Sequence, residues 1–385
     1  MPYFMQVGDV PRKRFSRFEK TDGSFYAAEV MGEDGFSSDM SLLYHKEAPT
    51  GVLSYEKANY RAPELYDNDP LIPRLYRTSG LAVSGNTLTA RTAICGNEDV
   101  MVSFVVADTT SPLYRNAIAD ELYFVHEGSA TMESIFGSLP VEKGDYVLIP
   151  KGTTHRFVPS SNLRALVFEV AGHVRPPDHY LTKYGQYSQM APYSEMDLKR
   201  PTGPLLLEGE NVEVMVRTRQ GMTRYVYQTH PFDVIGWFGC NYPYVFNVRD
   251  FSPITGSFHR PPPSAQVFEA TNLVFCNFVP RMLDYDPRAM PIPSFHSNVD
   301  SEEVLFYDEG NFATRKGGVE RGAISLHPSG HTHGPHPAAL KNVGARVGQR
   351  SEECVIMLDT FRPLRLAKES AKLEVPDYVM SWTRP

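Results

Sequence analysis

Short runs of β-branched and aromatic residues recur along the chain, separated by turns rich in glycine and proline. The clearest runs are residues 101–107 (MVSFVVA), 164–170 (RALVFEV), 211–217 (NVEVMVR), 270–279 (ATNLVFCNFV) and 354–359 (CVIMLD). Runs of this length and composition are typical of β-strands. Helix is expected only at residues 337–342 and 366–372, so the pattern predicts an all-β chain with few short helices.

The composition agrees with this pattern and narrows the class of protein. The 385 residues include 31 prolines and 28 glycines, which indicates many turns. A formal net charge of -7, without any Lys/Arg-rich run, argues against nucleic acid as a partner. The N-terminus has no apolar leader, and no run approaches the ~18 apolar residues that span a bilayer, so we expect a cytoplasmic protein with no membrane partner.

The four cysteines, at positions 95, 240, 276 and 354, lie far apart and form no C-x-x-C pair. Such pairs are typical of zinc sites and of redox-active dithiols. We therefore expect largely buried thiols rather than disulfides or a cysteine-bound metal.

Two segments of the chain repeat one pattern of fixed residues. In each copy a glutamate lies seven residues before a glycine, and the pattern G-x5-P-x-G-x2-H follows. The glutamate and histidine are Glu121 and His155 in the first copy, and Glu303 and His333 in the second. A strand, a tight Pro/Gly turn and a histidine at the start of the next strand would give this spacing.

Both copies resemble the two sequence motifs of the cupin family. The resemblance implies a double-stranded β-helix, which is a jelly-roll barrel, occurring twice in the chain. The irregular, proline-rich region at residues 175–204 looks like the connection between the barrels. We therefore predict an N-terminal barrel over residues 1–204 and a C-terminal barrel over residues 205–385.

The first repeat lacks most of the side chains that a metal would need. Cupins normally carry an H-x-H pair before the glutamate, but the corresponding residues here are Tyr114 and Asn116. Only Glu121 and His155 remain, which are too few ligands for tight binding of a transition metal. We predict that the N-terminal barrel is metal-free and structural, and that His155 is a hydrogen-bonded polar residue.

The second repeat retains a complete set of candidate ligands. Counting back from Glu303 gives His296, and His333 follows downstream. Two imidazoles and one carboxylate form the facial triad of non-heme Fe(II) oxygenases, which leaves coordination positions open for substrate and O₂. A closed structural zinc site would require four protein ligands.

Glu302 competes with Glu303 for the third ligand position. The spacing from His296 allows either residue, whereas the seven-residue distance to Gly310, equal to that in the first repeat, favours Glu303. Neighbouring residues of a strand point to opposite faces, so only one of the two can reach the barrel interior.

The segment from residue 231 onward resembles homogentisate 1,2-dioxygenase. The motifs that carry the resemblance are residues 231–237 (PFDVIGW), 241–244 (NYPY), 278–281 (FVPR), 295–298 (FHSN), 301–302 (SE), 325–327 (SLH) and 333–335 (HGP). The resemblance covers most of the chain from Pro231 to about Pro335, and it is weak in the N-terminal half.

The resemblance implies Fe(II)-dependent cleavage of the homogentisate ring by O₂ to maleylacetoacetate, a step of tyrosine and phenylalanine catabolism. The implied partners are the small aromatic substrate, O₂ and further copies of the chain in a trimer or hexamer. His259 falls where the family carries its active-site base, and His327 falls where it carries a second active-site histidine. An imidazole is suited to accept a phenolic proton near neutral pH.

We place Tyr307, Phe312 and His336 on the substrate side of the site. Phe312 departs from the family, which has a tyrosine at this position, near the carboxylate of the substrate. Gentisate, or another hydroquinone or aminophenol acid, is therefore an alternative substrate. A non-catalytic cupin binding module is the alternative from a different class of function.

Overall fold

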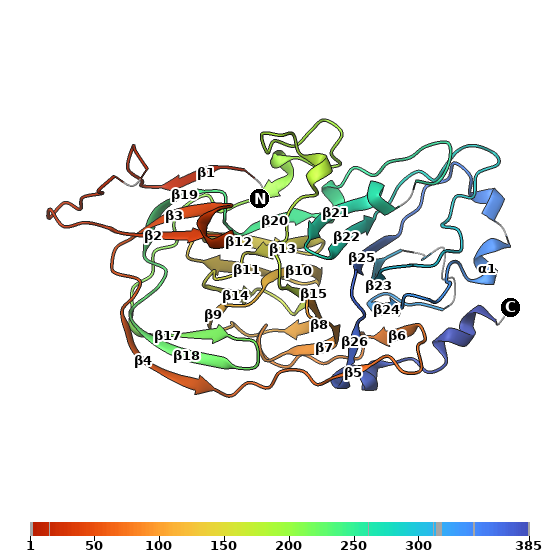
Figure 1. The fold of residues 1–385 in the computed structure, drawn as a ribbon, viewed down its shortest axis with the longest axis horizontal. Helices are drawn as coiled ribbons and strands as arrows, with labels where there is room; N and C mark the ends of the chain where they lie inside the picture. Colours follow the sequence, from red (N-terminus) through yellow and green to blue (C-terminus); the bar gives the residue numbers. More distant parts are fainter. Residues whose placement is uncertain are drawn as a thin grey trace.

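The computed structural model describes residues 3–14, 16–260, 262–310, 312, 318–341 and 343–383. Over these ranges the chain is almost entirely strands and turns, with 3₁₀ helices and the short α-helix α1 (Pro337–Leu340) (Figure 1). The prediction of an all-β chain is confirmed. None of the described helices has the length and apolar character needed to cross a bilayer.

Three sheets lie mainly in the N-terminal half (Figure 1). The first has the order β1 (Met5–Gly8), β19 (Val234–Gly239), β3 (Met40–His45) and β2 (Ala27–Gly32). The second has the order β16 (Leu198–Lys199), β20 (Tyr244–Asn247), β13 (Asp145–Ile149), β10 (Asp120–Glu127), β15 (Leu163–Val170), β8 (Val100–Ala107), β7 (Arg91–Gly96), β26 (Arg365–Ala367) and β5 (Leu65–Asp67). The third has the order β12 (Gly137–Glu142), β11 (Ser129–Ser134), β14 (His155–Pro159), β9 (Leu113–Asn116), β17 (Glu210–Arg217), β18 (Met222–Thr229) and β4 (Val52–Ala58).

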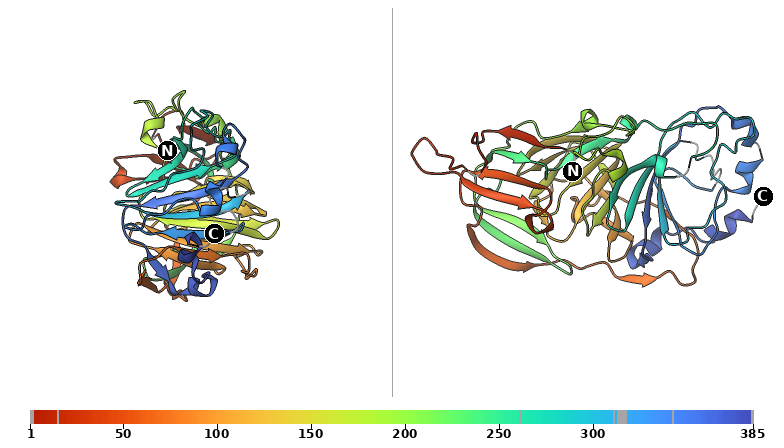
Figure 2. Two further views of the ribbon diagram at one scale, coloured as in Figure 1. Left: turned by 90° about the vertical axis from the view of Figure 1, so that its right-hand side faces the viewer. Right: turned by 45° about the horizontal axis from the view of Figure 1, so that its top comes forward.

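A fourth sheet lies mainly in the C-terminal half. This half lies beside the N-terminal half along the long axis of the molecule (Figure 2). Its order is β21 (Gln266–Ala270), β22 (Leu273–Phe278), β25 (Cys354–Thr360), β23 (Glu302–Glu309), β24 (Ala323–His327) and β6 (Arg74–Arg77). The short 3₁₀ helices include η7 (Lys368–Leu373) and η8 (Tyr378–Trp382), which pack close to this sheet.

Strand pairing crosses the boundary that we predicted between residues 204 and 205. Strands β17 to β20 follow that boundary in sequence but hydrogen-bond to strands of the N-terminal half. In the opposite direction, β6 pairs with β24 of the C-terminal sheet. Hydrogen bonding therefore links the two halves through exchanged strands, and the division at residue 204 stays a prediction.

The helix predicted at residues 366–372 is not α-helical. Leu366 pairs with Tyr66 on one side and with Cys95 on the other, so it belongs to β26, and η7 begins only at Lys368. Pairing with two neighbouring strands outweighs the local preference of these residues for helix. The other predicted helix begins at Pro337 as expected, and its last residue, at position 342, lies outside the described residues.

A continuous hydrophobic core joins the two halves. The ring of Phe306, from β23, lies 5.8 Å from that of Phe104 and 6.1 Å from that of Phe124 in the N-terminal half. Beside these rings, Nδ1 of His126 lies 2.5 Å from Oδ1 of Asp308, and both side chains are buried. His126 and Asp308 each follow the repeat glutamate by five residues, so equivalent strands of the two repeats pack against each other.

The cysteines fit the expectation drawn from the sequence. All four lie in described ranges, none forms a disulfide, and Cys95, Cys276 and Cys354 are buried.

Candidate metal centre

Strand β23 presents two different faces. Glu303, Leu305 and Tyr307 line a cavity, whereas Val304 and Phe306 face the core that joins the two halves. This alternation follows from the two-residue period of a strand. β23 therefore separates the interior of the C-terminal half from the core behind it.

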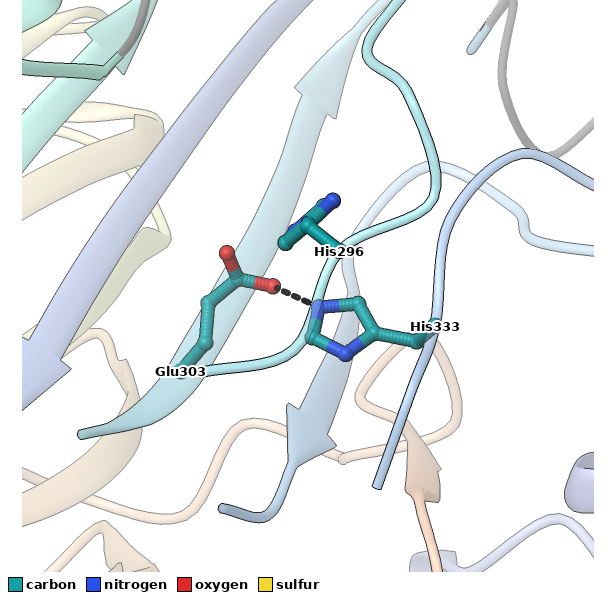
Figure 3. A group of neighbouring side chains, drawn as sticks. All are labelled: His296, Glu303 and His333. Atoms are coloured by element: carbon teal, nitrogen blue, oxygen red, sulfur yellow. Dashed lines mark ion pairs between the residues drawn. The ribbon is translucent and has the colours of Figure 1, made fainter. Parts of the chain in front are cut away.

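The three predicted ligands converge beside this cavity. His296 and His333 lie on irregular segments that pair through two backbone hydrogen bonds of 2.9 Å each. Glu303 approaches from β23, and candidate ligand atoms of the three side chains all lie within 4.8 Å of one another. Figure 3 shows the carboxylate of Glu303 facing the ring of His333, with His296 beside them.

Backbone carbonyl groups fix which ring nitrogen each histidine offers. Nδ1 of His296 lies 2.8 Å from the carbonyl oxygen of Ser294, and Nδ1 of His333 lies 3.2 Å from that of His331. A carbonyl oxygen can only accept, so each Nδ1 carries the proton and each Nε2 presents a lone pair. Hydrogen bonds of this kind commonly orient histidine ligands in metal sites.

Glu303 is held in its ionised form. Its Oε2 lies 2.7 Å from Nδ1 of His327 and 3.3 Å from Nε2 of His333. Burial alone would raise the pKa of Glu303, but the hydrogen bond from Nδ1 of His327 and the contact with His333 outweigh burial and keep that pKa well below its usual value. A negative oxygen ligand is thus ready for a cation.

The arrangement around His333 fits a metal ion. Nε2 of His333 is buried, has no hydrogen-bond partner among the described residues, and directs its lone pair toward the Glu303 carboxylate. Two acceptors that face each other are stabilised by a cation between them. Because His296 adds a second imidazole at the same point, the donor set suits a divalent transition metal with open coordination positions.

A cavity of about 390 Å³ is lined by His296 and Glu303, and its wall includes Gly334, the residue directly after His333. Its lining residues are His259, Phe278, Pro293, Ser294, His296, Ser297, Asn298, Glu303, Leu305, Tyr307, Phe312, Gly334, Pro335, Glu353 and Val355. The size and the mainly apolar walls suit a small aromatic molecule.

His259 lies in the wall of this cavity. Its Nδ1 lies 3.7 Å from Oδ2 of Asp284, which is 1% exposed and contacts Arg281 on its other side. Burial lowers the pKa of His259, and the positive charge of Arg281 lowers it further. The imidazole is therefore neutral at neutral pH and can accept a proton.

The remaining predicted residues occupy different positions. Tyr307 and Phe312 line the cavity with rings 5.0 Å apart, and the Tyr307 hydroxyl lies 3.1 Å from Oγ of Ser325. His327 is fully buried and contacts Glu303, but it is not part of the cavity wall. His336 also lies outside that wall, buried with its Nε2 3.2 Å from Oγ of Ser381.

Glu302 points away from the three converging side chains. Its Oε2 accepts a 2.7 Å hydrogen bond from the backbone N–H of Leu364. Asp120, the equivalent residue of the first repeat, accepts hydrogen bonds from the backbone N–H groups of Lys151 and Val174 in the same way. Both carboxylates therefore anchor loops, which accounts for two adjacent acidic residues in each repeat.

In the first repeat, an arginine side chain lies beside the repeat glutamate. Arg91 donates a 2.7 Å hydrogen bond to Oε1 of Glu121, and its guanidinium also contacts Glu169 at 3.2 Å. His155 contacts the other oxygen of Glu121 at 3.4 Å. Sequence spacing did not identify Arg91, because it lies thirty residues before the glutamate on a different strand.

Three comparisons with known proteins bear on this site. The family model "Homogentisate 1,2-dioxygenase N-terminal" matches residues 83–248. A protein of Saccharolobus solfataricus described as a dioxygenase is 35% identical over 395 aligned positions, which cover 99% of each chain. The chain belongs to the homogentisate 1,2-dioxygenase family. It is an enzyme of the dioxygenase class, and membership of this family implies a metal cofactor.

The match of the family model corrects one expectation. We expected the resemblance to homogentisate 1,2-dioxygenase to be weak in the N-terminal half, yet the model covers residues 83–248, which include the whole first repeat. The first repeat has Tyr114 and Asn116 where cupins normally carry an H-x-H pair, so it offers fewer recognisable motif residues.

Other proteins found by the comparisons are less similar in sequence. The homogentisate 1,2-dioxygenase of Nitrobacter hamburgensis is 26% identical over 285 residues, which cover 70% of this chain and 62% of that enzyme. Among solved structures, a cupin 2 conserved barrel domain protein from Leptotrichia buccalis aligns with 75% of the chain at 9% identity and a TM-score of 0.33. The protein Ylba of E. coli aligns with 79% of the chain at 10% identity and a TM-score of 0.34.

Proposed function

We propose that this enzyme is an Fe(II)-dependent ring-cleaving dioxygenase that converts homogentisate and O₂ to maleylacetoacetate. The observation that carries the proposal is the convergence of His296, Glu303 and His333 beside a cavity of suitable size. The match of the chain to the homogentisate 1,2-dioxygenase family and the site's two imidazoles and one carboxylate support the same chemistry. Both oxygen atoms enter the product, so no external reductant is required.

In this proposal His296, Glu303 and His333 hold the iron. Bound iron would supply open coordination positions at which a phenolic oxygen and O₂ meet and exchange electrons. The protein contributes the ionised carboxylate and two imidazoles whose Nε2 atoms are already oriented. Preorganised ligands reduce the cost of reorganisation on binding.

His259 is the proposed general base. It lies in the cavity wall with His296 and Glu303, and its lowered pKa keeps the ring neutral and ready to take the proton of a substrate hydroxyl. Asp284 lies on the Nδ1 side of His259, where a carboxylate favours the tautomer that presents Nε2 to the cavity. His327 would act through Glu303, because it contacts this carboxylate and does not line the cavity.

The walls of the cavity would hold the aromatic ring. Phe278, Leu305, Phe312 and Val355 present apolar surface, which suits a planar ring and keeps water away from the reacting atoms. Phe312 has no hydroxyl to offer to a substrate carboxylate, so gentisate or another hydroquinone acid stays a second candidate. A homo-oligomeric state and a place in tyrosine catabolism stay predictions as well.

The test follows O₂ consumption and the ultraviolet absorbance of the ring-opened product after anaerobic reconstitution with Fe(II). Homogentisate and gentisate are offered in parallel. We expect stoichiometric O₂ uptake with homogentisate, lost in His333→Ala and retained in His179→Ala, whose ring lies on the surface. O₂ uptake with gentisate alone would show that gentisate, and not homogentisate, is the substrate. An iron-loaded enzyme that is inert toward every hydroquinone would overturn the proposal.

A further inference from the structure

The segment that carries the ligand His333 is covered by residues from far along the chain. In η8, Nε1 of Trp382 donates a 3.0 Å hydrogen bond to the carbonyl oxygen of Gly334, the residue directly after His333. The Trp382 ring also packs edge-on against the rings of His336 and His327, at centroid distances of 4.6 and 6.2 Å. One side chain therefore contacts three residues around the candidate metal site.

The position of Trp382 is itself fixed by its neighbours. The buried ring of Tyr378 lies 5.0 Å from that of Trp382, and Oγ of Ser381 lies 3.2 Å from Nε2 of His336. Packing on two sides limits the rotamers that Trp382 can adopt. Its N–H group is thus held in place before any metal binds.

The preceding residues tie the same segment to the edge of the C-terminal sheet. Oε1 of Glu374 lies 2.6 Å from Arg74, and the N–H of Val375 donates a 2.7 Å hydrogen bond to the carbonyl oxygen of Leu75. Arg74 and Leu75 belong to β6, which pairs with β24, the strand that ends at His327. The segment from Glu374 to Trp382 therefore spans from the sheet edge to the loop of His333.

The contact with Gly334 falls where the two histidine-bearing segments meet. A Cβ atom on Gly334 would lie only 2.9 Å from Cα of Phe295, the residue directly before His296. The paired hydrogen bonds between His296 and His333 lie next to this close approach. A shift of Gly334 would therefore change the separation of the two imidazoles.

We propose that Trp382 is a positioning residue of the metal site, which holds Gly334 so that His333 keeps the place and orientation needed to bind the metal together with His296. The proposal rests on the proposed function, because it assumes that the triad binds a metal. Residues that orient metal ligands typically change metal affinity by about 10- to 100-fold when they are replaced.

The experiment compares Trp382→Phe, which removes the N–H donor and keeps a ring, with Trp382→Ala, which removes both. Met380→Ala is the matched control, because Met380 lies in the same 3₁₀ helix with its side chain 47% exposed. Two quantities are measured on the full chain: the dissociation constant for Fe(II) under anaerobic conditions, and amide hydrogen exchange of residues 328–336 in the metal-free protein.

We expect Fe(II) affinity to fall about tenfold in Trp382→Phe and further in Trp382→Ala, with faster exchange of residues 328–336 in both and no change in Met380→Ala. Unchanged affinity or unchanged exchange in either Trp382 variant would overturn the positioning role. If Trp382→Ala does not fold, Trp382→Phe alone decides. A wild-type chain that binds no Fe(II) would instead overturn the proposed function, and exchange would then decide the role of Trp382.

Discussion

The two repeats surround an equivalent buried glutamate with different side chains. In each repeat a buried glutamate meets a histidine from the P-x-G turn, and this histidine pairs along the backbone with a residue seven positions before the glutamate: Tyr114 with His155, and His296 with His333. In the first repeat the positive charge comes from Arg91, which is part of the chain. In the second repeat we propose that it comes from a metal ion.

The difference determines what each barrel can do. Burial would raise the pKa of Glu121, but the charge of Arg91 and the contact with His155 lower it to about 2, so the carboxylate stays ionised without any metal. A guanidinium has no open coordination position, so it can neutralise charge but cannot bind O₂. A metal held by three side chains can do both, and that repeat is the one that adjoins the large cavity.

The largest contrast is expected when the same change is made in both repeats. Glu303→Gln should remove the anionic ligand and lower ring-cleaving activity by more than about 100-fold, because a neutral amide is a poor ligand for iron. Glu121→Gln should keep wild-type activity per folded chain. Oxygen uptake by the two purified variants checks this prediction. Similar losses of activity in both variants would contradict a catalytic second repeat and a structural first repeat.

His259 is not one of the three candidate metal ligands, so its replacement should affect catalysis and not iron binding. His259→Ala is expected to lower kcat/KM by about 100-fold while Fe(II) binding is retained. In the unmodified enzyme the base form of His259 is the neutral ring, and its pKa is lowered. Activity should therefore persist as pH falls to about 6.5 and decline only below it. A pH–rate profile that does not change in His259→Ala would exclude this residue as the base.

Replacement of Arg91 tests the role of the positive charge in the first repeat. Arg91→Met leaves the buried carboxylates of Glu121 and Glu169 without their cation, so the free energy of unfolding should fall by about 3–5 kcal/mol. Arg288→Met, at a side chain that is 91% exposed, should change it by less than about 0.5 kcal/mol. Denaturant unfolding measures both values, and equal stability of the two variants would show that Arg91 carries no structural charge.

The smallest effect is expected at the acidic residue beside each repeat glutamate. Glu302→Gln and Asp120→Asn each weaken hydrogen bonds to backbone N–H groups, so each should cost about 1–2 kcal/mol of stability. Iron content should be unchanged in both. Loss of iron in Glu302→Gln, measured alongside Glu303→Gln, would identify Glu302 as the ligand instead.

Much of this arrangement could be read from local sequence pattern. The strand runs and the repeated G-x5-P-x-G-x2-H pattern predicted the all-β fold, because strand alternation and tight turns are local properties. The spacing to Gly310 singled out Glu303, and the structure turns this side chain toward His296 and His333. Their role as ligands stays a prediction until metal binding is measured.

Other features depend on contacts between distant parts of the chain. The exchange of β6 and β17 between the halves, the burial of Arg91 against Glu121 and the contact of Trp382 with Gly334 all join residues far apart in sequence. No periodicity or motif encodes such contacts, since they follow from how finished sheets pack. We predicted His336 on the substrate side, yet its ring packs edge-on against that of Trp382, outside the described cavity wall.

The most direct test of the contrast between the repeats is the iron stoichiometry of the purified chain after anaerobic reconstitution with Fe(II) and removal of loosely bound metal. We expect one iron per chain in the wild type and in Glu121→Gln, and none in Glu303→Gln or His333→Ala. Two irons per chain, or one iron that persists in Glu303→Gln and His333→Ala but is lost in Glu121→Gln, would contradict a metal site in the second repeat alone.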